Sequence, residues 1–128
     1  MSALPAVAQQ PVVRRIDPAR AAIGAVHMNW RMVTNNIATV AEELSEADYA
    51  YRPVGSVRTF GEQFAHVAGA QGVMCAAALG ETAPAEDHYE RTARTKAALV
   101  EALKATTAVC ERAYAQTDAE ATAATQLW

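Results

Sequence analysis

The sequence is short of several features that would each indicate a class of protein. Basic residues are scattered and outnumbered, with 11 Lys and Arg against 14 Asp and Glu, which gives a formal net charge of -3. Without a basic cluster there is no electrostatic surface for a phosphate backbone or an anionic bilayer, so we expect no nucleic-acid partner and no membrane partner. No apolar run approaches the roughly 20 residues that a membrane-spanning helix needs.

Signals for strands are missing as well. The sequence shows no alternation of apolar and polar residues and few β-branched runs, while alanine, a strong helix former, is abundant. A chain of 128 residues that is 52% hydrophobic is long enough to build one compact core and too short for two. The sequence therefore predicts a single all-α domain.

The N-terminus carries a trace of an export signal. Ala6, Val7 and Ala8 precede Gln9 in the small-x-small form of a signal-peptidase site, yet the basic and apolar regions of a signal peptide are missing. Two interpretations stay open: chance in an alanine-rich chain, which implies a cytoplasmic protein, or the remnant of a signal, which implies a periplasmic or secreted one. We expect residues 1–15 to be flexible and residues 16–128 to form the domain.

The strongest periodic pattern lies in the first half of the chain. Asp17 and Pro18 form a helix start, since Asp caps free amides and Pro suits the first helical position. Apolar residues then recur at alternating spacings of three and four, which is typical of a helix in a bundle. We expect the inward face of this helix to carry Ile23, Val26, Trp30, Val33, Ile37, Val40 and Leu44.

Two further helices follow. Thr59 and Glu62 form a capping box, which predicts a helix from about Phe60 to Leu79 with Gly80 as its stop. One side of it is lined by small residues, which allow a neighbouring backbone to approach closely: Gly61, Ala65, Gly69, Gly72 and Ala76. A third helix is expected from near Thr92 or Thr95 to Ala115. Its core-facing residues are expected to be Leu99, Leu103, Thr106, Cys110 and Ala113. Beyond Thr117 we find neither a helix-capping residue nor a helical spacing of apolar residues.

These residues resemble a known family. From about Ile16 to Ala115, the sequence is similar to the DinB/YfiT-like family. The similarity rests on a long first helix with an internal tryptophan, followed by "LSEADYAYRP", "VRTFGEQFAHVAGAQ" and a Cys-containing helix that ends in "LGE". The most specific pieces are "YRP" and "RTFGEQFAHVA". The resemblance implies an up-down-down-up four-helix bundle, of which this chain supplies three long helices while the C-terminal fourth is missing.

The resemblance also implies a metal site. Many members hold a divalent metal with three histidines, one of which matches His66, and the other two come from an H-x-x-x-H pair on the fourth helix. It therefore implies Zn, Ni or Mn at a site that is incomplete in this chain. In its complete form the protein would be a metal-dependent hydrolase or thiol-dependent transferase acting on an unknown small molecule. The alternative is a non-catalytic scaffold or partner-binding module without metal, and H-x-x-x-H beyond Trp128 would discriminate between them.

No other residue is expected to complete that site. Antiparallel pairing of the first two helices places Ala38 level with His66, and His27 about 16 Å from that level at the helical rise per residue. His88 falls in the polar connection after Gly80, where we expect it to be solvated. Glu62 lies one turn before His66, but it is the expected capping acid.

The two cysteines, Cys75 and Cys110, form no C-x-x-C motif and lack zinc-finger spacing, which excludes a structural zinc site. In a simple hairpin of the second and third helices, Cys110 would lie about 16 Å beyond the level of Cys75. Parallel helices, as the resemblance implies, place both at one end, where a disulfide is feasible. We expect proximity. Three helices would also leave an apolar groove uncovered, through which we expect a homodimer.

Overall fold

The computed structural model describes residues 15–124, and every regular element in that range is a helix. Three are long: α1 (Ala21–Glu43), α3 (Phe60–Ala78) and α5 (Lys96–Tyr114). The others are short: η1 (Pro18–Arg20), α2 (Glu46–Tyr49), α4 (His88–Thr92) and α6 (Asp118–Ala124). The all-α prediction is confirmed. The segment expected to be flexible, residues 1–15, lies outside the described residues except for its last member.

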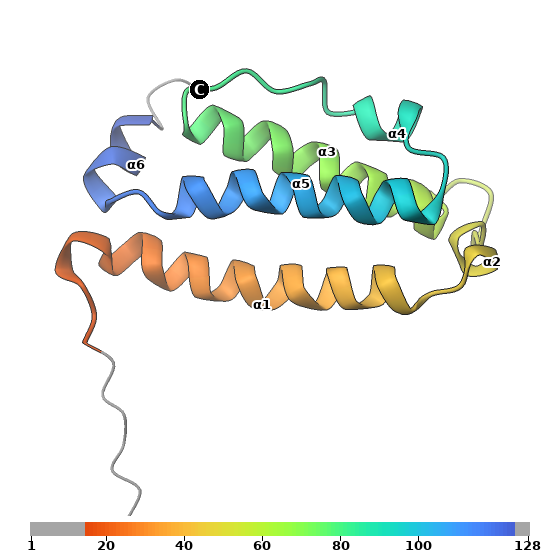
Figure 1. The fold of residues 1–128 in the computed structure, drawn as a ribbon, viewed down its shortest axis with the longest axis horizontal. Helices are drawn as coiled ribbons and strands as arrows, with labels where there is room; N and C mark the ends of the chain where they lie inside the picture. The colour runs from red at the N-terminus through yellow and green to blue at the C-terminus, as the bar shows by residue number, and fades with distance from the viewer. Residues whose placement is uncertain (1–14, 125–128) are drawn as a thin grey trace, which may run out of the picture.

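The long helices form a layered bundle with α5 between the other two, in contact with both α1 and α3. Figure 1 shows α3 and α5 running in the same direction and α1 in the opposite one. The chain returns from the end of α3 to the start of α5 through residues 79–95, which run back along α3 and include α4. The predicted parallel arrangement of the second and third long helices is therefore confirmed, whereas α4 was not anticipated in the polar connection.

The close pairing of α3 and α5 follows from their sequences. Thr59 caps α3 by accepting a hydrogen bond from the Glu62 amide, and Thr95 caps α5 in the same way, so the later of the two predicted starts is correct. On the small-residue side of α3, Gly61 and Gly72 lie against Leu99 and Thr106 of α5, whereas Gly69 faces the segment that follows α3. The residues predicted to turn inward on α5 are buried. The core of this pair comprises Phe64, Ala65, Ala68, Leu99, Ala102, Leu103, Thr106 and Cys110.

A disulfide joins the two parallel helices at their shared end. The Cα atoms of Cys75 and Cys110 lie 4.9 Å apart, and the bond closes a loop over a separation of 35 residues. The predicted proximity is confirmed and the covalent bond is present. Cys110 is fully buried and Cys75 is half-buried, so the link lies at the edge of the α3–α5 core.

The predicted inward face of α1 is only half correct. Ile23, Trp30, Ile37 and Leu44 are half-buried, but the alternate members Val26, Val33 and Val40 are 56%, 48% and 45% exposed. The most buried α1 residues are instead Thr34 and Ala41, which the apolar pattern did not include. The reason is that α5 is the main partner of α1, so α1 buries a narrow face centred on Thr34.

Both ends of α1 are capped by other parts of the chain. The Asp118 carboxylate accepts hydrogen bonds from the amides of Ala22 (3.0 Å) and Ile23 (2.9 Å). These bonds, that from Ile23 first, lower the pKa of Asp118 below its ordinary value. At the other end Lys96 Nζ donates to the carbonyls of Glu42 (2.7 Å) and Leu44 (2.6 Å). Long-range contacts thus satisfy backbone groups that a helix leaves free at its termini.

The expectation of no capped helix beyond Thr117 is wrong. Thr117 and Glu120 exchange side-chain and backbone hydrogen bonds of 2.8 Å and 3.3 Å, which start α6 and place Asp118 against α1. The T-x-x-E spacing of a capping box was present in the sequence, but no apolar period follows it. Arg20 reinforces this end of the bundle by donating to the carbonyl oxygens of Tyr114 and Gln116.

Replacing both Cys75 and Cys110 with alanine should lower the free energy of unfolding by about 3 to 4 kcal/mol, because the unfolded chain regains the freedom that a closed 35-residue loop removes. Chemical denaturation of wild type and double variant, each with and without a reductant, measures this. Reductant should destabilise the wild type alone. Equal stability of the two proteins without reductant would contradict the structural role of the bond.

Candidate functional site

His66 lies on α3, on the side that faces the returning segment between α3 and α5. Its Nδ1 atom is 3.2 Å from Oε1 of Glu90, on α4, and 3.5 Å from Oε1 of Glu86. The His66 side chain is 30% exposed. The imidazole is therefore held from one side by carboxylates and remains open to solvent.

The Glu90 carboxylate is itself fixed in place. Arg58, just before α3, donates from Nε and Nη2 to its two oxygens, each at 3.2 Å. A two-point guanidinium contact sets the orientation of a carboxylate as well as its position. Arg58, Glu90 and His66 thus form a chain in which each group orients the next. No described residue bonds to Nε2 of His66, so that nitrogen is free to bind a ligand or a proton.

Residues 81–87, here called the strap, bring the two glutamates to this place. Gly80 adopts the left-handed conformation (φ 69°) that turns the chain out of α3, and the Arg112 guanidinium pairs with the Glu81 carboxylate at 2.6 Å. Further along, a Cβ on Gly69 would lie 1.8 Å from the Glu86 carbonyl oxygen. Only glycine at residue 69 lets the strap lie so close to α3, where Glu86 and Glu90 reach His66.

The described residues do not assemble a complete metal site. Within residues 15–124, no three His, Cys, Asp or Glu side chains are arranged so that they could hold a metal ion. Glu62 is engaged elsewhere, as predicted: it accepts from the Thr59 amide (2.8 Å) and from Arg52 (2.7 Å). The Thr59 amide is the main cause that lowers the pKa of the Glu62 carboxyl.

The other two histidines lie apart from His66. His27 contacts the last turn of α5, with Nε2 2.8 Å from Glu111 and its ring stacked on Tyr114 at a centroid distance of 5.0 Å. That is the opposite end of the bundle, in agreement with the predicted separation. His88 is half-buried with its ring edge against Tyr89, so the expectation that it would be solvated is only partly correct.

Sequence reasoning singled out His66 but missed its neighbours. Arg58 opens the motif "RTFGEQFAHVA" without a sign of its partner, whereas Glu86 and Glu90 lie in a stretch that appears as a solvent-exposed polar segment. The only signal for them is the four-residue spacing of the two glutamates, which places both carboxylates on one side of a helical turn. That signal has no meaning until the strap is known to run back along α3.

A pocket of about 220 Å³ opens next to this cluster. The first turns of α3 and α5 border it, and its polar side chains have both signs of charge: Glu62 and Glu90 face it together with Arg94 and Lys96. Ala65, directly before His66, forms part of its apolar wall. His66 itself does not line the pocket, but Glu90, which contacts the imidazole, does, so this carboxylate connects the pocket with His66.

Comparison with known proteins supplies the family. The model of the DinB superfamily matches residues 29–128, which is most of the chain, and the chain belongs to that superfamily. No curated protein and no solved structure matches significantly. None of the helices in residues 15–124 combines the length and apolarity that crossing a bilayer requires.

Gly69→Ala should destabilise the fold by about 1 to 3 kcal/mol, because the new methyl group cannot share space with the Glu86 carbonyl and the strap must move. Thermal denaturation and the NMR shifts of His66 measure the two effects. Gly24→Ala is the matched control in α1: its methyl group would meet nothing within 4 Å, and stability should stay equal or rise by up to about 1 kcal/mol. An unchanged strap in Gly69→Ala would contradict the close approach.

Proposed function

We propose that this member of the DinB superfamily binds a divalent metal ion, such as Zn, Ni or Mn, with His66 as one ligand through Nε2. The observation that carries the proposal is the 3.2 Å contact between Nδ1 and Glu90. Histidines that bind metals typically donate the other ring N–H to a carboxylate, which fixes the tautomer and makes the free nitrogen a better ligand. Arg58 strengthens this arrangement by holding Glu90 in a single orientation.

One imidazole makes a weak site by itself. In this proposal the remaining ligands lie outside the described residues, on the H-x-x-x-H helix that the family resemblance implies. A metal bound there would lower the pKa of a bound water or thiol and so supply a nucleophile near neutral pH. This chain's own residues would hold the metal (His66), keep the proton on Nδ1 (Glu90) and offer the adjacent pocket to a small-molecule substrate. Whether the reaction is a hydrolysis or a thiol transfer depends on that substrate.

Removing His66 should abolish specific metal binding. Titration of Zn²⁺ into protein that includes the H-x-x-x-H helix, followed by calorimetry, is expected to show one site in the wild type and none in His66→Ala. Glu90→Gln should retain the site but weaken it by about tenfold, the lower limit for loss of an orienting carboxylate.

His88→Ala is the matched control for that titration, because His88 lies in the same region and makes no contact with Glu90. It should bind Zn²⁺ as the wild type does. Metal retained in His66→Ala, or lost equally in both histidine variants, would refute the assignment.

A second candidate function is a partner-binding module, favoured by the exposed apolar residues of α1. Val26, Val33 and Val40 recur every seven residues and lie on one stripe. They lie on the same side of α1 as Ile37 and Leu44, which pack against the hydrophobic core. On α3, Phe60 and Met74 are 43% and 63% exposed. A heptad stripe can pair with its own copy about a two-fold axis, so we propose a homodimer as the form this module takes.

Val33→Lys should shift such a dimer to monomers, because it places a charge at the centre of the stripe. The folded monomer should tolerate the change, since Val33 is already half exposed. Sedimentation equilibrium measures the association, with Asn36→Lys on the outer side of α1 as the control that leaves it unchanged. A wild type that stays monomeric at about 100 μM, a concentration where even weak interfaces associate, would refute the dimer.

A further inference from the structure

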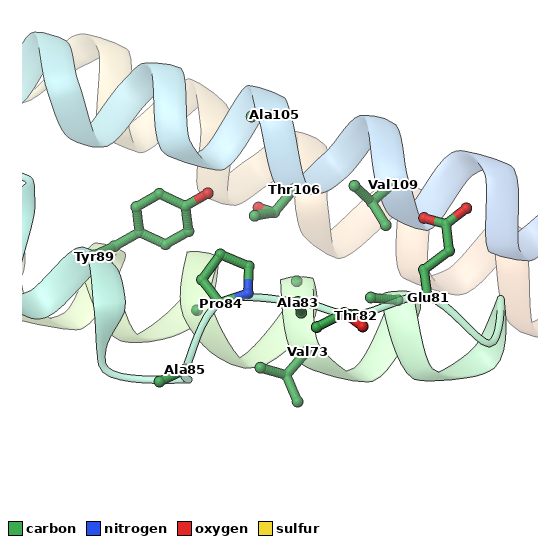
Figure 2. A pocket seen from close by; sticks show the side chains of 13 residues that line it. Val73, Glu81, Thr82, Ala83, Pro84, Ala85, Tyr89, Ala105, Thr106 and Val109 are labelled. Atoms are coloured by element: carbon green, nitrogen blue, oxygen red, sulfur yellow. The ribbon is translucent and has the colours of Figure 1, made fainter. Parts of the chain in front are cut away.

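The strap borders a second, more apolar pocket, which Gly69 also lines and His66 does not. Its volume is about 140 Å³, and it lies between α3, α5 and residues 81–85. Figure 2 shows the Tyr89 ring and the side chains of Thr106 and Val109 between the strap and α5. We propose that this pocket binds a single-ring aromatic molecule that carries one hydroxyl group, the chemistry of a phenol.

The walls of the pocket are built from small residues. Gly72 and Ala76 of α3 face Ala105 and Val109 of α5 across it, and Pro84 of the strap covers it. The backbones would close this space if the strap could settle deeper, but both ends of the strap are fixed. Arg112 holds Glu81 at one end, and the Glu86 carbonyl rests on Gly69 at the other. The pocket is therefore maintained by the fold and does not depend on a ligand.

The size of the pocket determines the size of its ligand. The pocket opens to solvent beside exposed Ala105, and its volume is close to the roughly 150 Å³ of apolar cavities that take up benzene, so it suits one six-membered ring. An occupant that fits should raise the thermal stability of the protein.

The polar group of the ligand follows from Tyr89. The Tyr89 ring packs against the hydrophobic core, and its hydroxyl points along the pocket toward Thr106 without a hydrogen bond to any described residue. The Thr106 hydroxyl, in contrast, is already bonded to the Ala102 carbonyl (3.0 Å) and to Gln71 (2.8 Å). The other polar lining side chains are Glu81, which is paired with Arg112, and Thr82, which is exposed. Tyr89 therefore supplies a free donor and acceptor beside the apolar walls, which matches a ring with one hydroxyl.

Phenol and toluene are the probes that test this proposal, because they share a ring and differ in the hydroxyl. In a ¹⁵N NMR titration we expect phenol to shift the amides of Gly72, Tyr89 and Val109, with a dissociation constant of about 0.1 to 1 mM for so small a ligand. Ala105→Leu, which fills the pocket from an exposed position, should weaken phenol binding at least tenfold. Ala108→Leu, exposed on the same helix outside the pocket, should leave it unchanged.

Tyr89→Phe separates the two parts of the proposal. It should weaken phenol several-fold and leave toluene unchanged, because only the hydroxyl contact is lost. His66→Ala should bind phenol as the wild type does, so the result does not depend on the metal site. Phenol shifts that centre on the exposed stripes of α1 and α3, or equal binding to wild type and Ala105→Leu, would overturn the proposal.

Discussion

The parallel contact between α3 and α5 is the constraint from which the rest of the molecule follows. Two helices that are consecutive in the bundle and run in the same direction cannot be joined by a tight turn, so the chain must travel back along their full length. Residues 79–95 form this returning segment. The disulfide between Cys75 and Cys110 joins α3 and α5 at the end of the bundle where the segment begins. The strap and α4 exist because α3 and α5 are parallel.

The return of the chain accounts for both functional features. In this returning segment, α4 presents Glu90 to His66, and residues 81–85 cover the apolar pocket beside Tyr89. The strap lies close enough to do so because residue 69 is glycine. The disulfide between Cys75 and Cys110 also bears on how the site is assembled, because it fixes the end of α3 from which the strap leaves.

The sequence predicted the helices well where local signals define them. Capping residues located the starts of α3 and α5, because a side chain that bonds a free amide acts within one turn. The family resemblance supplied the parallel topology, which spacing alone left open. The sequence could not identify which side of α1 is buried, since an apolar period shows that a helix packs but does not name its neighbour. Glu90 was missed for a related reason: its relation to His66 spans 24 residues and arises only from tertiary structure.

The capping of α1 has a consequence for how the domain folds. This helix has no side-chain cap at its N-cap residue Arg20, and the groups that satisfy its ends, Asp118 and Lys96, come from α6 and α5. Excised as a peptide, α1 would lose both and fray from each end, because an isolated helix needs its own terminal partners to persist in water. The longest helix of the protein is therefore not an autonomous unit. Its order depends on segments that are synthesised after it.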